Sequence, residues 1–211
     1  MNRKRTFAAS FAALKEVRLF VVFLCLACLS FLFLDRPLAT FLHPLFPFYA
    51  RPVRICSHLI SPLYPLLFGF VFLILWLARV KSIRMRPFFE VTAVQFIAGG
   101  IVRLLKVIVA RARPDVLWLP ELKKSPLNHH FHSFPSGHTM AAFALAATLA
   151  LFYPRCSLLF FGAAFCLSLS RVLLLDHYLS DLLGTAALAI IIARFVHERL
   201  QEIDPTTPSL H

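Results

Sequence analysis

The stretch LFVVFLCLACLSFLFL, residues 19–34, contains no charged side chain. A helix needs about 20 predominantly apolar residues to cross the hydrocarbon core of a bilayer. We expect this run and five later ones to form spanning helices. The later runs cover residues 59–78, 88–110, 136–153, 156–175 and 179–196. The sequence predicts an all-α polytopic membrane protein, in which residues 1–211 form one domain with a six-transmembrane-helix bundle and a polar tail at residues 201–211.

The composition supports this class of protein. Hydrophobic residues make up 59% of the chain and charged residues 15%, whereas soluble domains average about 45–50% and about 25%. The difference excludes a soluble enzyme, a disordered chain and a coiled coil. Cys25 and Cys28 form a C-x-x-C pattern, but they lie inside the first apolar run. We interpret them as small buried hydrophobic residues rather than metal ligands or disulfide partners.

The chain has a net charge of +12, from 22 Lys and Arg against 10 Asp and Glu. We attribute this charge to interactions with the membrane. Basic residues beside membrane spans set orientation and bind anionic headgroups, so no nucleic-acid partner is expected. Lys and Arg are more frequent on the N-terminal side of the spans, which predicts both chain ends in the cytoplasm. Because a long basic stretch precedes the first run and no small-residue cleavage site follows it, we expect a retained span rather than a signal peptide.

The first polar motif is KVIVARARP, residues 106–114. Lys106 and Arg113 are about two helical turns apart and therefore share a face. Pro114 disfavours helical geometry at Arg113, so the span is expected to end there. Arg111 and Arg113 are compatible with side chains that extend from a helix end to the headgroups. Lys106 lies deeper, and a cation inside a membrane span indicates a functional site.

The second motif is FPSGH, residues 134–138, at the start of the fourth span. Proline favours a first helical turn, and Gly137 lets a ligand approach the backbone closely. Free N–H groups at a helix start, including the turn that begins at Ser136, bind anions. His138 is then well placed to donate a proton. Taken alone, the motif favours a plain helix start that begins with proline.

The third motif is SRVLLLDHYLSD, residues 170–181. His177 and Asp181 are four residues apart, so on a helix they would lie on one face. A carboxylate beside an imidazole fixes its tautomer and raises its basicity, and the other ring nitrogen then acts as a base or nucleophile. A structural ion pair at a helix cap is the alternative. Asp176 is expected to point to another face.

Alternation of the spans places all three motifs on the same side of the membrane. Three fixed cations, Lys106, Arg113 and Arg171, together with a helix N-terminus favour a dianionic phosphate. A His–Asp pair facing that phosphate indicates phosphoryl transfer through nitrogen. No cluster of carboxylates is available for magnesium or calcium, so we expect no cofactor and no metal.

The patterns K-x6-R-P, P-S-G-H and S-R-x5-H-x3-D resemble the signature of the type 2 phosphatidic acid phosphatase superfamily. Its relatives include bacterial lipid phosphatases and the soluble vanadium haloperoxidases. The resemblance is complete within the motifs, which extend from Lys106 to Asp181, and the expected span layout extends it over most of the chain. The matching residues are Lys106, Arg113, Pro114, Pro135, Ser136, Gly137, His138, Ser170, Arg171, His177 and Asp181.

The resemblance implies a role for each site residue. His177 would attack phosphorus and form a phosphohistidine, and Asp181 would orient and activate His177. His138 would protonate the leaving oxygen and then deprotonate water. The phosphate-binding residues would be Lys106, Arg113, Ser136, Gly137 and Arg171.

These roles imply an integral-membrane lipid phosphatase. The expected topology places its site on the non-cytoplasmic face, and the short chain is similar to bacterial members, so we expect a bacterial inner membrane with the site on the periplasmic face. Expected substrates are undecaprenyl pyrophosphate, phosphatidylglycerophosphate, phosphatidic acid and lipid A phosphates. A lipid-to-lipid phosphotransferase would use the same site, and an anion transporter would not need a nucleophile with a proton donor. We set aside a zinc site at His129, His130 and His132, because no cysteine or carboxylate neighbour completes it. The role of Arg103 stays open.

Overall fold

A computed structural model of the protein describes residues 20–58, 70, 74, 85–119, 121–125 and 127–203. The described residues form helices and loops and include no strand. This result confirms the expected all-helical class. The second expected span, residues 59–78, lies outside the described residues except at positions 70 and 74.

The N-terminal helical segment is longer than the apolar run that predicts it. Residues 20–29 are helical and continue through a π-helical turn, η1 (Ser30–Leu34), into α2 (Asp35–Leu42). A short 3₁₀ turn, η2 (His43–Leu45), then leads to α3 (Phe46–His58). A π-turn accommodates one extra residue, which changes the face that the following residues present.

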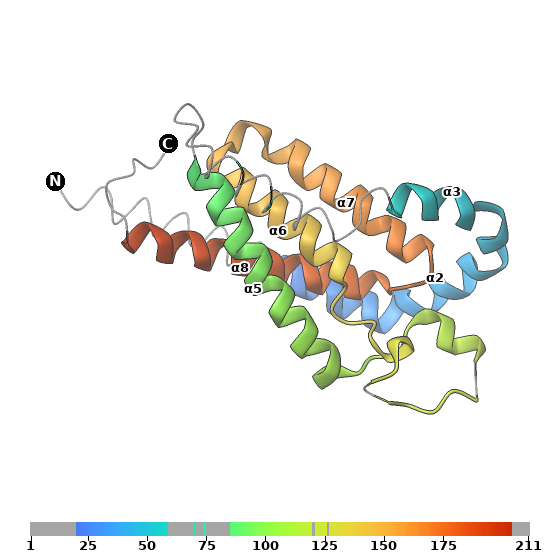
Figure 1. Ribbon diagram of the computed structural model, residues 1–211. Helices are drawn as coiled ribbons and strands as arrows, with labels where there is room; N and C mark the ends of the chain where they lie inside the picture. The colour runs from blue at the N-terminus through green and yellow to red at the C-terminus, as the bar shows by residue number, and fades with distance from the viewer. Residues whose placement is uncertain are drawn as a thin grey trace.

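Four further helices follow close to the expected ranges (Figure 1). They are α5 (Met85–Val109), α6 (Gly137–Phe152), α7 (Ser157–Leu173) and α8 (Leu179–Ile203). The shorter turns between them are η3 (Pro114–Trp118), η4 (His129–Phe131) and η5 (Pro154–Cys156). The expected end of the third span at Pro114 is close to the observed one, because Arg113 already has an extended backbone with ψ of 162°.

In the described part of the chain, four helical segments are long and apolar enough to cross a membrane. They are Phe20–Ile55, Arg86–Trp118, Pro154–Leu173 and Leu179–Glu202. Helix α6 is also apolar, but it has only 16 residues. Together with the many exposed large hydrophobic side chains, these helices are those of an integral membrane protein. The count of six spans stays a prediction.

Helix α6 forms the centre of the bundle and packs against α5, α7 and α8. In Figure 1 it lies between α5 and α7. Its neighbours meet it mainly through small residues, and Ala144, Ala186, Ala189 and Ala193 are fully buried. Small side chains let helix backbones approach closely, which favours packing in an apolar solvent.

A second apolar cluster packs α2 against α7 and α8. Ala39 and Leu42 of α2 pack with Val172, Leu175 and Leu182 at the junction of α7 and α8. At this end of the bundle, on the right of Figure 1, α5 and α7 end and α6 and α8 begin. The alternation of helices therefore brings the three sequence motifs to one end, as expected.

The other end of the bundle contains a buried carboxylate. Glu90 of α5 is fully buried, and its Oε1 lies 2.6 Å from His197 Nδ1 of α8. His197 Nε2 lies 2.8 Å from the Gln201 amide. This polar chain connects α5 to α8 far along the bundle from the three motifs.

We expect Glu90→Gln to lower the free energy of unfolding by about 1–3 kcal/mol, because a buried hydrogen-bonded charge is lost. Thermal unfolding in detergent measures the change. Glu202→Gln is the matched control, since its pair with Arg199 is exposed and contributes little. Equal melting temperatures for the two variants would contradict the prediction.

Candidate active site

Two backbone hydrogen bonds join the first motif to the loop that precedes the second. The Ser133 N–H donates to the Arg111 carbonyl at 3.0 Å, and the Arg113 N–H donates to the His130 carbonyl at 2.8 Å. The loop therefore runs beside the chain that leaves α5. This pairing fixes the position of Ser133, a fully buried residue that contacts His177 and Asp181 of the third motif.

His177 lies in the turn between α7 and α8 and is 3% exposed. Its Nδ1 is 2.5 Å from the Ser133 carbonyl oxygen. A carbonyl only accepts hydrogen bonds, so Nδ1 must carry the proton in the neutral ring. The Nε2 atom is then unprotonated, and its lone pair is available as a nucleophile.

The surroundings of His177 favour this neutral form. Burial lowers the pKa of His177 well below its ordinary value of 6.5, and the charges of Arg113, Lys106 and Arg171 lower it further. The hydrogen bond to the Ser133 carbonyl acts in the opposite direction. The three cations that the sequence assigns to phosphate binding therefore act together on the nucleophile that it predicts.

Asp176 connects two of these cations. Its carboxylate lies 2.6 Å from Arg171 Nη2 and 3.5 Å from Arg113 Nη1. The Arg113 Nε atom is buried and has no hydrogen-bond partner among the described residues. A guanidinium with an unused donor and a partly exposed carboxylate partner suits an exchangeable anion site. Asp176 therefore lies among the predicted phosphate-binding residues, although the sequence interpretation placed it on another face.

Asp181 is fully buried, but among the described residues its hydrogen-bond partners do not include the His177 ring. Its Oδ2 accepts hydrogen bonds from the Ser133 hydroxyl at 2.5 Å and from the Tyr178 N–H at 2.9 Å. Its Oδ1 pairs with Arg111 at 2.5 Å. Because α8 begins at Leu179, His177 precedes the helix, and the four-residue spacing does not place the two side chains on one helical face. Asp181 instead binds two neighbours of His177: Ser133, whose carbonyl lies beside Nδ1, and Tyr178, the next residue in the chain.

The start of α6 supplies the residues of the second motif. Ser136 is the N-cap, and its hydroxyl accepts a hydrogen bond from the Thr139 N–H at 3.5 Å. Its own N–H donates to Thr185 Oγ1 of α8 at 3.0 Å, so this donor is already used within the protein. A Cβ at Gly137 would meet open space, which leaves room for a ligand at the first turn. His138 lies in the same turn.

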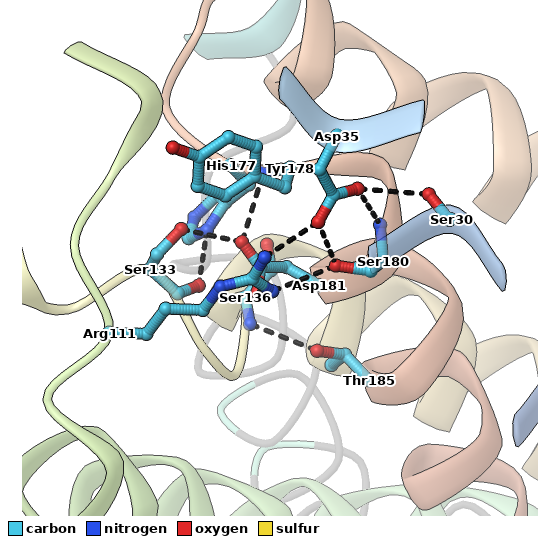
Figure 2. A network of polar contacts seen from close by, with 10 residues as sticks. All are labelled: Ser30, Asp35, Arg111, Ser133, Ser136, His177, Tyr178, Ser180, Asp181 and Thr185. Carbon is cyan, nitrogen blue, oxygen red and sulfur yellow. Dashed lines mark hydrogen bonds and ion pairs between the residues drawn. The ribbon is translucent and has the colours of Figure 1, made fainter. Parts of the chain in front are cut away.

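Figure 2 shows a polar network that the sequence interpretation did not identify. Arg111 lies at its centre and reaches Asp35 on the N-terminal segment as well as Asp181 on α8. The only sequence signal was an acidic residue at the end of an apolar run, which is rare and functional in membrane spans. Nothing in the spacing indicated its partner.

The histidine-rich loop forms pairs rather than a larger cluster. His130 Nδ1 lies 2.8 Å from Asp115 Oδ2, and the His130 ring lies 3.9 Å from the His129 ring. In the described ranges, no group of three or more His, Cys, Asp or Glu side chains has a metal-binding arrangement.

Residues 85–204, more than half of the chain, match the sequence profile of the PAP2 superfamily. The chain belongs to this superfamily, as the three motifs suggested. The matched region begins with α5 and contains every residue of the candidate active site except Asp35.

Three curated proteins are similar to parts of the chain. Lipid A 1-phosphatases of Rhizobium etli and Rhizobium johnstonii are each 37% identical over 93 residues, which is 43% of this chain and 40% and 38% of theirs. The chain thus matches well under half the length of these two relatives. The bacitracin transport permease protein BcrC of Bacillus licheniformis is 28% identical over 135 residues, 64% of each chain. No solved structure matches.

We expect His177 to titrate well below pH 6.5, so that it is neutral at and below neutral pH. In Lys106→Met, one repelling charge is lost and the pKa should rise toward the ordinary value. Nitrogen-15 NMR of histidine-labelled protein, with His177→Ala used for assignment, measures both titrations. Lys123→Met, which removes an exposed loop cation, is the control and should leave the pKa unchanged. An unchanged pKa in Lys106→Met would contradict the proposed coupling.

We expect Gly137→Ala to fold normally and to bind inorganic phosphate about tenfold more weakly, a loss of about 1.4 kcal/mol. The added methyl group would occupy open space at the first turn of α6, where we expect the phosphate to bind. Calorimetric titration with phosphate measures the affinity. Gly162→Ala on α7 is the control, because it adds the same methyl group in open space away from the motifs. Equal affinities would show that phosphate does not approach Gly137.

Proposed function

We propose that the protein is an integral-membrane lipid phosphatase that hydrolyses a phosphate monoester or pyrophosphate through a phosphohistidine. The observation that supports it most is the environment of His177: the ring is buried, its Nδ1 is hydrogen-bonded to the Ser133 carbonyl, and burial and three cations lower its pKa. A neutral imidazole beside fixed cations is a nucleophile for a bound dianion. Simple anion binding needs the cations but not this imidazole.

In the first chemical step, His177 Nε2 attacks phosphorus and the bond from phosphorus to the lipid oxygen breaks. His138 gives its proton to that oxygen, and the lipid alcohol or lipid monophosphate leaves. In the second step, water attacks the phosphohistidine and gives a proton to His138. The P–N bond breaks, its electron pair returns to Nε2, and inorganic phosphate is released. The two steps restore both histidines to their starting states.

The Ser133 carbonyl has a specific use in this sequence of steps. Phosphorylation of Nε2 gives the His177 ring a positive charge while Nδ1 keeps its proton. The carbonyl oxygen, 2.5 Å from Nδ1, stabilises that charge through the same hydrogen bond that fixes the tautomer. Lys106, Arg113 and Arg171 stabilise the charge of the transferring group. The proposal needs no metal ion.

For the substrate we propose a lipid A phosphate as the first candidate. Two relatives bear the name lipid A 1-phosphatase, and the segment they share with this chain is 37% identical. Undecaprenyl pyrophosphate, phosphatidylglycerophosphate and phosphatidic acid are the other three candidates. We further propose that the site faces the periplasm from a bacterial inner membrane, as the distribution of Lys and Arg favours.

A transporter is the second candidate function, because one relative is named a bacitracin transport permease protein. The two functions differ in what they require of His177. A transporter that lost the His177 imidazole would still move anions. A phosphatase that lost it would no longer turn over its substrate. A lipid-to-lipid phosphotransferase would keep the phosphohistidine and would differ only in the acceptor.

The decisive experiment measures phosphate release by the detergent-purified protein, with EDTA present, from the four lipid classes. We expect release from one class in clear excess, and we expect His177→Ala to reduce it by at least about 10³-fold while the protein stays folded. His129→Ala is the control, because this exposed loop histidine has no place in the two steps.

Near-wild-type release by His177→Ala would overturn the phosphohistidine mechanism. No release from any lipid by the folded wild-type protein would overturn hydrolysis. Supplying lipid acceptors, or anion-loaded vesicles, then separates phosphate transfer from transport.

A further inference from the structure

We propose that Asp35 is a positioning residue for His177, which acts through Arg111 on Asp181 and Ser133. Asp35 lies outside the three motifs and outside the segment that matches the PAP2 superfamily. The proposal concerns the geometry of His177, and its catalytic consequence rests on the proposed phosphatase function.

Asp35 has a full set of buried partners. It is 3% exposed, and its Oδ1 accepts hydrogen bonds from the Ser30 hydroxyl at 2.9 Å and the Ser180 N–H at 3.1 Å. Its Oδ2 accepts from the Ser180 hydroxyl at 2.5 Å and pairs with Arg111 Nη2 at 2.6 Å. A buried carboxylate is stable in an apolar bundle only with such partners.

The π-turn explains how Asp35 reaches this position. Residues five apart lie about 140° apart around a regular α-helix with 3.6 residues per turn. In η1 the Asp35 N–H instead donates to the Ser30 carbonyl, five residues back. The two side chains then lie on one face, and the Ser30 hydroxyl donates to Asp35. Such turns are frequent at functional sites.

Arg111 carries the effect of Asp35 to the third motif. Its Nη2 pairs with Asp35, and its Nη1 donates to Asp181 Oδ1 at 2.5 Å and to the Ser180 hydroxyl at 2.8 Å. Its guanidinium carbon also lies 4.6 Å from the centre of the Tyr178 ring. These contacts hold both terminal nitrogens of the guanidinium, and Figure 2 shows their hydrogen bonds and ion pairs.

From Asp181 the network reaches His177 by two routes. Asp181 Oδ2 accepts from the Ser133 hydroxyl, and the Ser133 carbonyl accepts from His177 Nδ1. The same Oδ2 accepts from the N–H of Tyr178, the residue that follows His177. Arg111 also fixes Ser133 directly, because its carbonyl accepts the Ser133 N–H. Asp35 thus acts through Arg111 and Asp181 on Ser133. The Ser133 carbonyl in turn determines which nitrogen of His177 carries the proton.

Asp35→Asn tests the proposal, because the amide keeps the size of the side chain and one acceptor but removes the charge that holds Arg111. We expect kcat to fall by about 10–100-fold, the effect of a small misplacement of a reacting group. We expect KM to stay within about twofold, since the phosphate-binding cations lie elsewhere. Asp35→Glu should recover less than full kcat, because the longer chain moves the carboxylate.

A double-mutant cycle with Arg111→Gln measures whether the two residues act as one unit. If Asp35 acts through Arg111, Asp35→Asn should change kcat little in the Arg111→Gln background. Two controls separate positioning from stability. Glu90→Gln removes an equally buried carboxylate charge at the other end of the bundle, and Val196→Ala weakens the apolar packing of α8 at that same end. Both should lower the melting temperature and leave kcat unchanged.

A readout without turnover keeps this proposal separate from the proposed function. Nitrogen-15 NMR of histidine-labelled protein should show His177 protonated on Nδ1 in the wild type and a mixture of tautomers in Asp35→Asn. An unchanged tautomer together with unchanged kcat would overturn the positioning role, even if phosphate release is confirmed. A changed tautomer would support it even if the wild type releases no phosphate, in which case the phosphatase proposal alone fails.

Discussion

The ion pairs of Arg111 with Asp35 and Asp181 are the interaction on which the site end of the bundle depends. A charge inside an apolar helical bundle must have partners within the protein, since neither lipid nor bulk water supplies them. Here one guanidinium satisfies two carboxylates from segments far apart in the sequence. It thereby fixes the N-terminal helix, the chain leaving α5 and the first turn of α8 relative to one another.

The carboxylates at the site end of the bundle are of two kinds, fully buried and partly exposed. Asp181 is fully buried, and its oxygens have permanent partners in Arg111, Ser133 and Tyr178. Asp176, only five residues earlier, is partly exposed and pairs with Arg113 at the longer distance of 3.5 Å. In the proposed site, a phosphate would compete with the second kind of carboxylate and not with the first. The same residue type is thus fully buried and paired inside the protein at one position and partly exposed at the other.

Local patterns predicted the helices and the meeting of the motifs, because apolar runs and Pro114 act over a few residues. They did not predict the partner of His177. The four-residue spacing to Asp181 implied a continuous helix, but Leu175 has a positive φ of 57° and the chain turns before α8 begins. They also did not predict Asp35, whose partner Ser180 is 145 positions away. Such pairings depend on how helices pack, which no local spacing determines.

The length of α6 adds an argument about the depth of the site. Sixteen residues at 1.5 Å each give about 24 Å, which is less than the ~30 Å hydrocarbon core. If α6 crosses a bilayer of that thickness, at least one of its ends therefore lies within the hydrocarbon core. Non-helical backbone at such a depth is stable only where protein covers it, and the loop before α6 meets this condition: Ser133 and Ser136 are fully buried, and the Ser136 N–H donates to Thr185. A phosphate site at this end of α6 is thus compatible with a headgroup drawn below the membrane surface while its acyl chains stay in the lipid.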